Sequence, residues 1–164
     1  MALLENLDID QLNNMVPAFN KESDRGAAIL AGSFLEHYLG LFLRSHTVEK
    51  AVADKLFGSM GPLATFSQRI AIAYAFGFID KEAFANLEQI RKIRNHFAHN
   101  PINATFDDDE VKKRVLLLST YGGEAKNYSN SHARQVYLFT CALFCGKFNK
   151  SMRERSLASG AVER

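Results

Sequence analysis

The sequence predicts an all-α fold: a single-domain helical bundle of about six or seven mostly antiparallel helices. Apolar residues recur every three or four positions along most of the 164-residue chain. No segment shows strand alternation or a hairpin turn of comparable strength. The connections between the periodic segments are short, which favours antiparallel packing of neighbouring helices.

Local signals place these helices along the chain. Ser23 and Asp80 are typical N-cap residues, and Gly77 is typical of a helix C-terminus. Pro17 kinks or ends the first helix, and Pro101 disfavours helical geometry at the residue before it. The acidic triplet at 107–109 suits the positive N-terminus of a further helix. The helices are expected at about residues 7–19, 23–45, 48–57, from Thr65 or Ser67 to 76, 80–99, 107–119 and 132–155.

The domain organisation and the core follow from the same pattern. We expect an N-terminal helix and linker at 1–22, the helical bundle at 23–155 and a flexible tail at 156–164. Apolar residues make up 47% and charged residues 23%, ordinary values for a soluble globular protein. Nine side chains are expected in the core: Leu30, Phe34, Tyr38, Ile70, Ile93, Phe97, Leu117, Phe139 and Leu143.

Charge and apolar patterning limit the functions that the chain can have. The net charge of +2 gives no dense basic face, so direct DNA binding is expected to be weak or absent. The N-terminal residues are acidic and do not form a secretory signal. No apolar run reaches roughly 18 residues, the length of a membrane span. These observations predict a cytoplasmic protein with no membrane segment.

The two cysteines, Cys141 and Cys145, stand four apart on one predicted helix. Side chains at this spacing point the same way along one face, and no chain reversal brings the sulfur atoms together. A metal site would need further ligands, and only His132 is close in sequence. We expect two buried free thiols, no metal and no cofactor.

The most distinctive polar residues are Arg94, Asn95 and His99, in the last turns of the helix that stops near Pro101. Asn95 and His99 share a helix face, whereas Arg94 and His99 diverge by roughly 140°. A second copy of the helix, facing the first in a homodimer, would overcome that separation. Arg94 could then hold a phosphate while His99 moves a proton.

The same residues also suit a purely structural role. Glu36 is the acid within the long apolar helix, and its carboxylate matches the two parallel donors of Arg94. Asn95 and His99 would then satisfy backbone carbonyls at the end of their helix. This interpretation predicts a structural polar cluster of four residues: Glu36, Arg94, Asn95 and His99.

The blocks that contain these residues resemble two known families. Arg94-Asn95-His96-Phe97-Ala98-His99 fits the R-x4-6-H signature of the HEPN superfamily, in which small helical bundles often act as dimeric, metal-independent ribonucleases. Residues 23–36, 57–70 and 90–99 resemble, in order and spacing, the mannitol operon repressor family. That resemblance implies an all-helical transcription regulator without a recognisable DNA-reading motif. Charged residues of these blocks are candidate binding groups: Asp24, Arg25, Arg69 and Arg91.

Two functions remain open on these grounds. The first is a regulator that acts through another protein, such as a transcription factor or a sugar-transport regulator. The second is a HEPN-type ribonuclease with Arg94, Asn95 and His99 as catalytic residues. A buried ion pair between Arg94 and Glu36 would favour the regulator, and an open cleft at a dimer interface would favour the ribonuclease.

Overall fold

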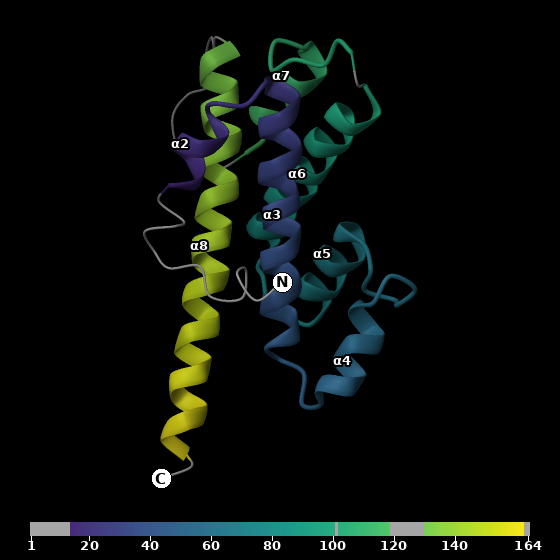
Figure 1. Cartoon of the computed structure of the whole chain (residues 1–164), viewed down its shortest axis with the longest axis vertical. Helices are drawn as coiled ribbons and strands as arrows, with labels where there is room; N and C mark the ends of the chain where they lie inside the picture. The colour runs from purple at the N-terminus through teal and green to yellow at the C-terminus, as the bar shows by residue number, and fades with distance from the viewer. Residues whose placement is uncertain (1–13, 101, 119–129, 163–164) are drawn as a thin grey trace.

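A computed structural model describes residues 14–100, 102–118 and 130–162 of the chain, and these ranges contain seven helices and no strand. The predicted all-α class is therefore confirmed. Figure 1 shows α3 and α8 side by side along the long axis of the molecule. The helices are α2 (Met15–Phe19), α3 (Asp24–Arg44), α4 (Lys50–Phe57), α5 (Phe66–Ala75), α6 (Lys81–His99), α7 (Asp109–Val115) and α8 (Asn130–Val162).

Side-chain caps begin three helices, two of them at the positions that the sequence indicates most clearly. Ser23 Oγ accepts a hydrogen bond from the backbone N–H three residues later, at 3.1 Å. Asp80 Oδ1 does the same at the start of α6, at 2.7 Å. Thr65 and Gln68 form a reciprocal capping box at the start of α5. Just past the end of α5, Gly77 has a φ of 70°, a conformation that favours glycine.

The core lies along α3, which packs most extensively on α8 and next on α6. Small residues on the buried face of α3, such as Ala27, Ala28 and Ala31, allow the neighbouring helices to approach closely. By length and composition α3 could also cross a membrane, but core helices of soluble proteins pass the same test. Ten of its residues are buried against other parts of the chain, which identifies it as the central core helix.

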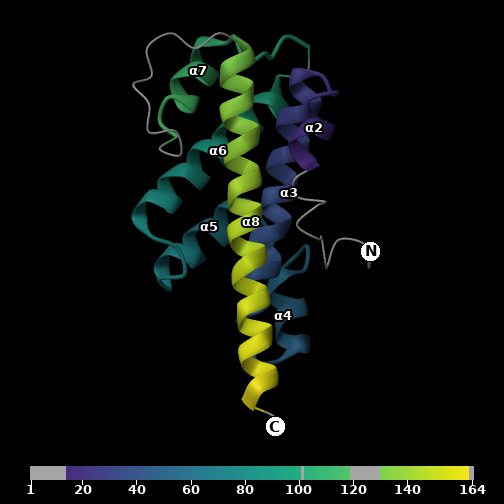
Figure 2. The ribbon, with the colours of Figure 1, turned by 90° about the vertical axis from the view of Figure 1, so that its left-hand side faces the viewer.

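The direction of the helices is mixed, so the prediction of mostly antiparallel neighbours is wrong for the largest contact. Asp24 bonds to Arg134, and Ser45 bonds to Arg155, so α3 and α8 run parallel (Figure 2). α6 is antiparallel to α3 and carries the chain back to the end where α3 begins. α8 then starts at that end, which makes the α3–α8 pair parallel.

The predicted core residues are confirmed for Tyr38, Ile70, Ile93 and Phe97, which are at most 1% exposed. Phe34 and Leu143 are only partly buried. Three predictions are wrong because these side chains are substantially exposed: Leu30 at 38%, Leu117 at 62% and Phe139 at 43%.

Leu30 and Phe139 lie on the exposed sides of their helices, and Leu117 lies beyond the end of its helix. Leu30 falls between the buried positions 27, 28, 31 and 32 on α3, and Phe139 projects to the outer side of α8. Leu117 follows the end of α7 at Val115, short of the predicted end near Ser119, so the helical register does not reach it. α8 in turn continues to Val162, past the expected end at Arg155 and into the segment expected to be a tail.

Cys141 and Cys145 are free thiols on the buried side of α8, as the sequence predicts. Burial raises the pKa of both thiols, that of Cys145 to about 12. The two sulfur atoms therefore remain protonated at neutral pH and pack as small apolar groups.

Candidate functional site

The polar cluster predicted around Arg94 lies between α6 and α3. Arg94 Nη2 donates a hydrogen bond to Glu36 Oε2 at 2.5 Å, and the two side chains are only 22% and 21% exposed. The Arg94 guanidinium carbon also lies 5.8 Å from the centroid of the Phe66 ring. One chain therefore supplies both partners of the ion pair.

Gly32 makes room for this arginine on the surface of α3. A Cβ atom at Gly32 would lie 2.8 Å from Arg94 Cγ and 2.9 Å from the hydroxyl oxygen of Tyr137. Tyr137 is fully buried, and its hydroxyl donates a hydrogen bond to the Ala28 carbonyl at 2.8 Å. A larger residue at Gly32 would therefore have to move either the arginine or a fixed tyrosine.

A second arginine, Arg69 of α5, crosses α3 two turns later. Gly32, Glu36 and Gly40 are spaced four apart and therefore lie on one face of α3. Arg69 Nη1 donates to the Glu36 carbonyl at 3.1 Å and would lie 3.0 Å from a Cβ atom at Gly40. Its Nε donates to the Leu63 carbonyl at 2.9 Å, which fastens the α4–α5 loop to the core. Burial lowers the pKa of Arg69, an effect that Glu36 partly offsets.

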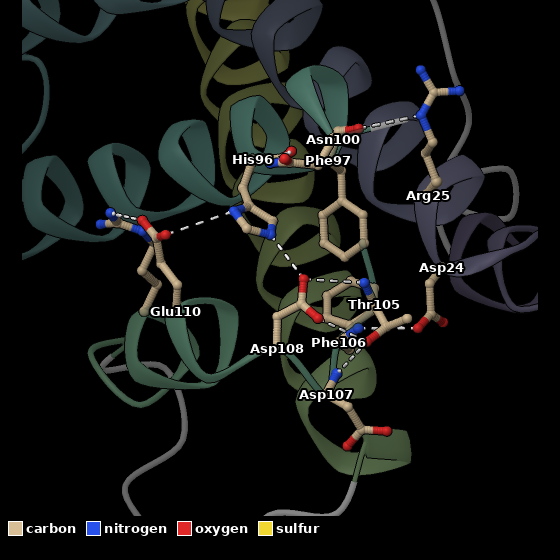
Figure 3. A network of polar contacts seen from close by, with 11 residues as sticks. Asp24, Arg25, His96, Phe97, Asn100, Thr105, Phe106, Asp107, Asp108 and Glu110 are labelled. Atoms are coloured by element: carbon tan, nitrogen blue, oxygen red, sulfur yellow. Dashed lines mark hydrogen bonds and ion pairs between the residues drawn. The ribbon is translucent and has the colours of Figure 1, made fainter. Parts of the chain in front are cut away.

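A second polar network surrounds the N-terminal end of α3. Asp24 Oδ1 accepts a hydrogen bond from Arg134 Nη1 at 2.7 Å. Its Oδ2 accepts one from the Phe106 backbone N–H at 3.0 Å (Figure 3). Arg134 Nη2 also donates to the carbonyls of Phe19 and Glu22, at 2.9 and 2.6 Å. One carboxylate thus joins α8, the segment before α7 and the link between α2 and α3.

His96 occupies the α6 side of this network, facing α7 (Figure 3). Its Nε2 lies 2.9 Å from Asp108 Oδ2, and its Nδ1 lies 3.8 Å from Glu110 Oε2. Thr105 Oγ1 donates to the other oxygen of Asp108 at 3.1 Å. The hydrogen bond with His96 lowers the pKa of Asp108, and those from Thr105 add to the effect. Each ring nitrogen of His96 therefore faces a carboxylate.

The end of α6 is secured by residues other than those that the sequence indicates. Arg25 Nε donates to the Phe97 carbonyl at 3.2 Å, and Asn100 Nδ2 donates to a carbonyl one turn earlier at 2.9 Å. Asn95 is half-buried and His99 is exposed, and the side chain of neither makes a hydrogen bond within the described ranges. Of the four residues in the predicted cluster, Glu36 and Arg94 are therefore the two whose side chains bond to each other.

The four candidate binding residues do not converge on one site. Asp24 and Arg25 lie at the N-terminal end of α3, whereas Arg69 crosses the same helix near Gly40. Arg91 forms a two-pronged ion pair with Glu88 on its own helix, at 3.0 and 2.9 Å. Each of the four therefore has a partner within the chain.

Two important residues were missed by the sequence analysis. Arg134 appears there only as part of the last helix, and its partner Asp24 is 110 residues away. His96 lies inside the Arg94–His99 motif, but its contact is with Asp108. The sequence indicated only that Asp108 lies near the N-terminus of a helix. The one sequence signal for this contact is the run of four acidic residues at 107–110, which favours a basic side chain nearby.

The arrangement can hold helices together through ion pairs and hydrogen bonds within the chain. The Arg94 guanidinium already donates to the Glu36 carboxylate, and His99 is exposed at the end of α6. Within those residues, no group of three or more His, Cys, Asp or Glu side chains could hold a metal ion.

Comparison with known proteins gives the family. No curated protein sequence is significantly similar to the chain. A solved structure, described as the X-ray structure of the MtlR-HPr complex from Escherichia coli, has the same fold with a TM-score of 0.67. It shares 17% sequence identity, and the match covers 84% of this chain and 98% of the other. Residues 28–138, more than half of the sequence, match the family model described as MtlR, mannitol repressor. This chain belongs to the mannitol repressor family.

Proposed function

We propose that this protein is a transcription regulator that acts by binding another protein and does not read DNA itself. The observation that carries the proposal is the family match over residues 28–138. The similar solved structure is a complex with HPr, so we propose an HPr protein from the same cell as the first partner to test. We also propose that this binding takes place in the cytoplasm.

The contacts of the motif support a regulator over a ribonuclease. A phosphate at Arg94 would have to displace Glu36 from a largely buried ion pair. Such a displacement strands a carboxylate, which is unfavourable unless another cation replaces the arginine. The net charge of +2 also gives little attraction for RNA or DNA.

Isothermal titration calorimetry of the full chain with its cognate HPr tests the proposal. We expect saturable binding, which a small unrelated protein such as ubiquitin does not reproduce. Analytical ultracentrifugation of the same samples gives the stoichiometry and shows whether the chain forms a homodimer. The proposed partnership fails if no heat of binding appears at concentrations up to about 1 mM, the limit of weak specific association.

A second experiment tests the ribonuclease directly. The chain and its His99→Ala variant are incubated with single-stranded RNA in buffer containing EDTA. The regulator proposal predicts no cleavage above a buffer control for either protein. Cleavage by the parent chain that disappears in His99→Ala would overturn it.

A further inference from the structure

A large apolar hollow lies at the end of the molecule away from the network around Asp24 and His96. It is formed by the C-terminal end of α3, by α4 with its following loop, and by α5, and it has a volume of about 740 Å³. Its walls include Leu43, Leu56, Phe57, Ile72 and Phe76. Volumes of about 300–1,000 Å³ are typical of pockets for small molecules.

The walls of the hollow are held in place by contacts outside it. The Phe57 ring lies under two guanidinium groups, 4.9 Å from that of Arg44 and 5.8 Å from that of Arg69. Arg69 also binds the carbonyls of Leu63 and Ala64, so the loop between α4 and α5 is fixed. The hollow is therefore formed before any ligand enters.

His46 supplies a fixed polar group in the wall. Its Nδ1 lies 2.9 Å from the Phe42 carbonyl, so this nitrogen carries a proton and donates it. The ring packs against Phe42 and Phe78, with centroids 4.7 and 4.4 Å apart. In the described ranges Nε2 has no hydrogen-bond partner, and it remains as an acceptor in the neutral ring.

The other polar side chains of the wall offer little more. Thr47 Oγ1 donates to the Arg44 carbonyl at 2.6 Å. The amide oxygen of Gln68 accepts hydrogen bonds from the backbone N–H and the hydroxyl of Thr65, at 3.0 and 2.9 Å. The NH₂ group of Gln68 is then the part of this side chain that could donate to a ligand. A ligand would thus meet apolar walls and very few hydrogen-bonding atoms.

We propose that this hollow binds a small, largely apolar molecule with an aromatic or aliphatic body and a single hydroxyl group that donates to His46 Nε2. A sugar alcohol does not fit this chemistry, because most of its hydroxyl groups would lose their hydrogen bonds to water without replacement. The proposal does not depend on the regulator function or on its protein partner.

The test uses 2-naphthol as the probe and follows the backbone amide signals of the full, isotope-labelled chain by NMR. We expect saturable shifts in α4 and α5. Ala71→Trp, at an exposed position in the wall, should fill the hollow and weaken binding at least about tenfold. The matched control is Ala85→Trp, at an exposed position of α6 outside the wall, which should bind as the parent does.

His46→Phe tests the proposed hydrogen bond, because it keeps a ring in the wall and removes the acceptor. It should weaken 2-naphthol binding by about tenfold, the value of one modest hydrogen bond. Thermal unfolding followed by circular dichroism shows that each variant is folded before it is compared.

Several results would overturn the proposal. These are no saturable shift, equal binding by the two tryptophan variants, or shifts elsewhere in the chain. Mannitol shifts equal to those of 2-naphthol would exclude an apolar site. Shifts of the α4 and α5 amides by HPr, with release of bound 2-naphthol, would identify the hollow as a protein-binding surface instead.

Discussion

Arginine side chains make several of the polar contacts between helices in this molecule. Arg69, Arg94 and Arg134 each reach from a different helix to α3 or to the segment before it. A guanidinium group has five donors in a rigid plane, so one arginine can bind a carboxylate or several carbonyls at once. At the residue scale, these arginines and the glycines that admit them fix how the helices are placed.

The first prediction concerns the ion pair of Arg94 and Glu36. Arg94→Ala and Glu36→Ala should each lower the free energy of unfolding by about 3 to 5 kcal/mol, because the remaining charge is left without its partner. The double variant should cost less than the sum of the two. Urea unfolding of all three proteins measures these differences.

Lys150→Ala serves as the control for this cycle, since Lys150 is 78% exposed and lies 3.8 Å from Glu154. It should change the stability by less than about 0.5 kcal/mol. Strictly additive losses for Arg94 and Glu36 would show that the two side chains do not stabilise each other.

The second prediction is that replacing two helical glycines by alanine changes the stability in opposite directions. Gly32→Ala should destabilise the protein by about 1 to 3 kcal/mol, because the new methyl group meets Arg94 and Tyr137. Gly146→Ala, where an added Cβ atom would meet nothing within 4 Å beyond its own stretch of helix, should stabilise it by about 0.5 to 1 kcal/mol. Thermal unfolding of both variants checks the opposite signs, and a stabilising Gly32→Ala would refute the packing described here.

The sequence predicts part of this residue-scale picture. The Glu36–Arg94 pair could be foreseen because an acid within an apolar helix needs a cation nearby. The contact of Arg134 with Asp24 could not, because it depends on two helices, 110 residues apart, starting at the same end of the molecule.

At the scale of elements, α7 is held to its neighbours by polar contacts with α6 as well as by two buried valines. His96 meets Asp108 and Glu110, and Arg114 Nη1 lies 3.5 Å from Gln89 Oε1. Val111 and Val115 are the buried residues of this short helix. The stability of α7 should therefore depend on charge as well as on apolar packing.

The third prediction uses the lowered pKa of Asp108. A carboxyl group whose pKa is depressed by folding stabilises the native state above the pKa of the unfolded chain, about 3.9. This stabilisation is lost as the pH falls through the lower, folded pKa. Asp108→Asn should therefore be less stable than the parent at pH 7, and the difference should shrink below about pH 4.

Urea unfolding between pH 3 and pH 7 measures this dependence. Asp109→Asn is the control, because Asp109 is an exposed neighbour for which the described ranges show no ion pair. It should show a smaller loss at neutral pH. A difference between Asp108→Asn and the parent that stays constant with pH would contradict the role of the ionised carboxylate.

Local signals predict where helices begin better than where they end. Ser23 and Asp80 lie at the positions that their side chains indicate, because a cap is a contact within a few residues. The ends of α7 and α8 depend on packing and on the absence of a strong stop signal. For this reason α7 stops before Leu117 and α8 continues past Arg155.

At the scale of the whole molecule, charge predicts how the chain meets nucleic acid. The fourth prediction is that the isolated protein binds DNA weakly and without sequence preference, with affinities of about micromolar or weaker at physiological salt. Gel-shift titrations at 50 and 200 mM salt should show binding that decreases with salt and is removed by competitor DNA. Nanomolar binding to one operator, unaffected by competitor, would contradict this.

The sequence predicts the all-α class of this fold, but it does not predict how the helices pack against one another. Helical periodicity is a property of each segment, so the helices of the described ranges could be foreseen. The parallel α3–α8 pair and the apolar hollow depend on how separate segments meet in space. Residues of the hollow such as Leu43, Phe57 and Ile72 come from three different helices, and no local pattern joins them.

The two thiols of α8 give this protein an internal probe of its own opening. Cys141 and Cys145 are 0% exposed. A thiol-reactive dye can reach their sulfur atoms only in molecules where α8 has moved away from its neighbours. The rate of modification in native buffer therefore measures how often the central helices separate, without any introduced label.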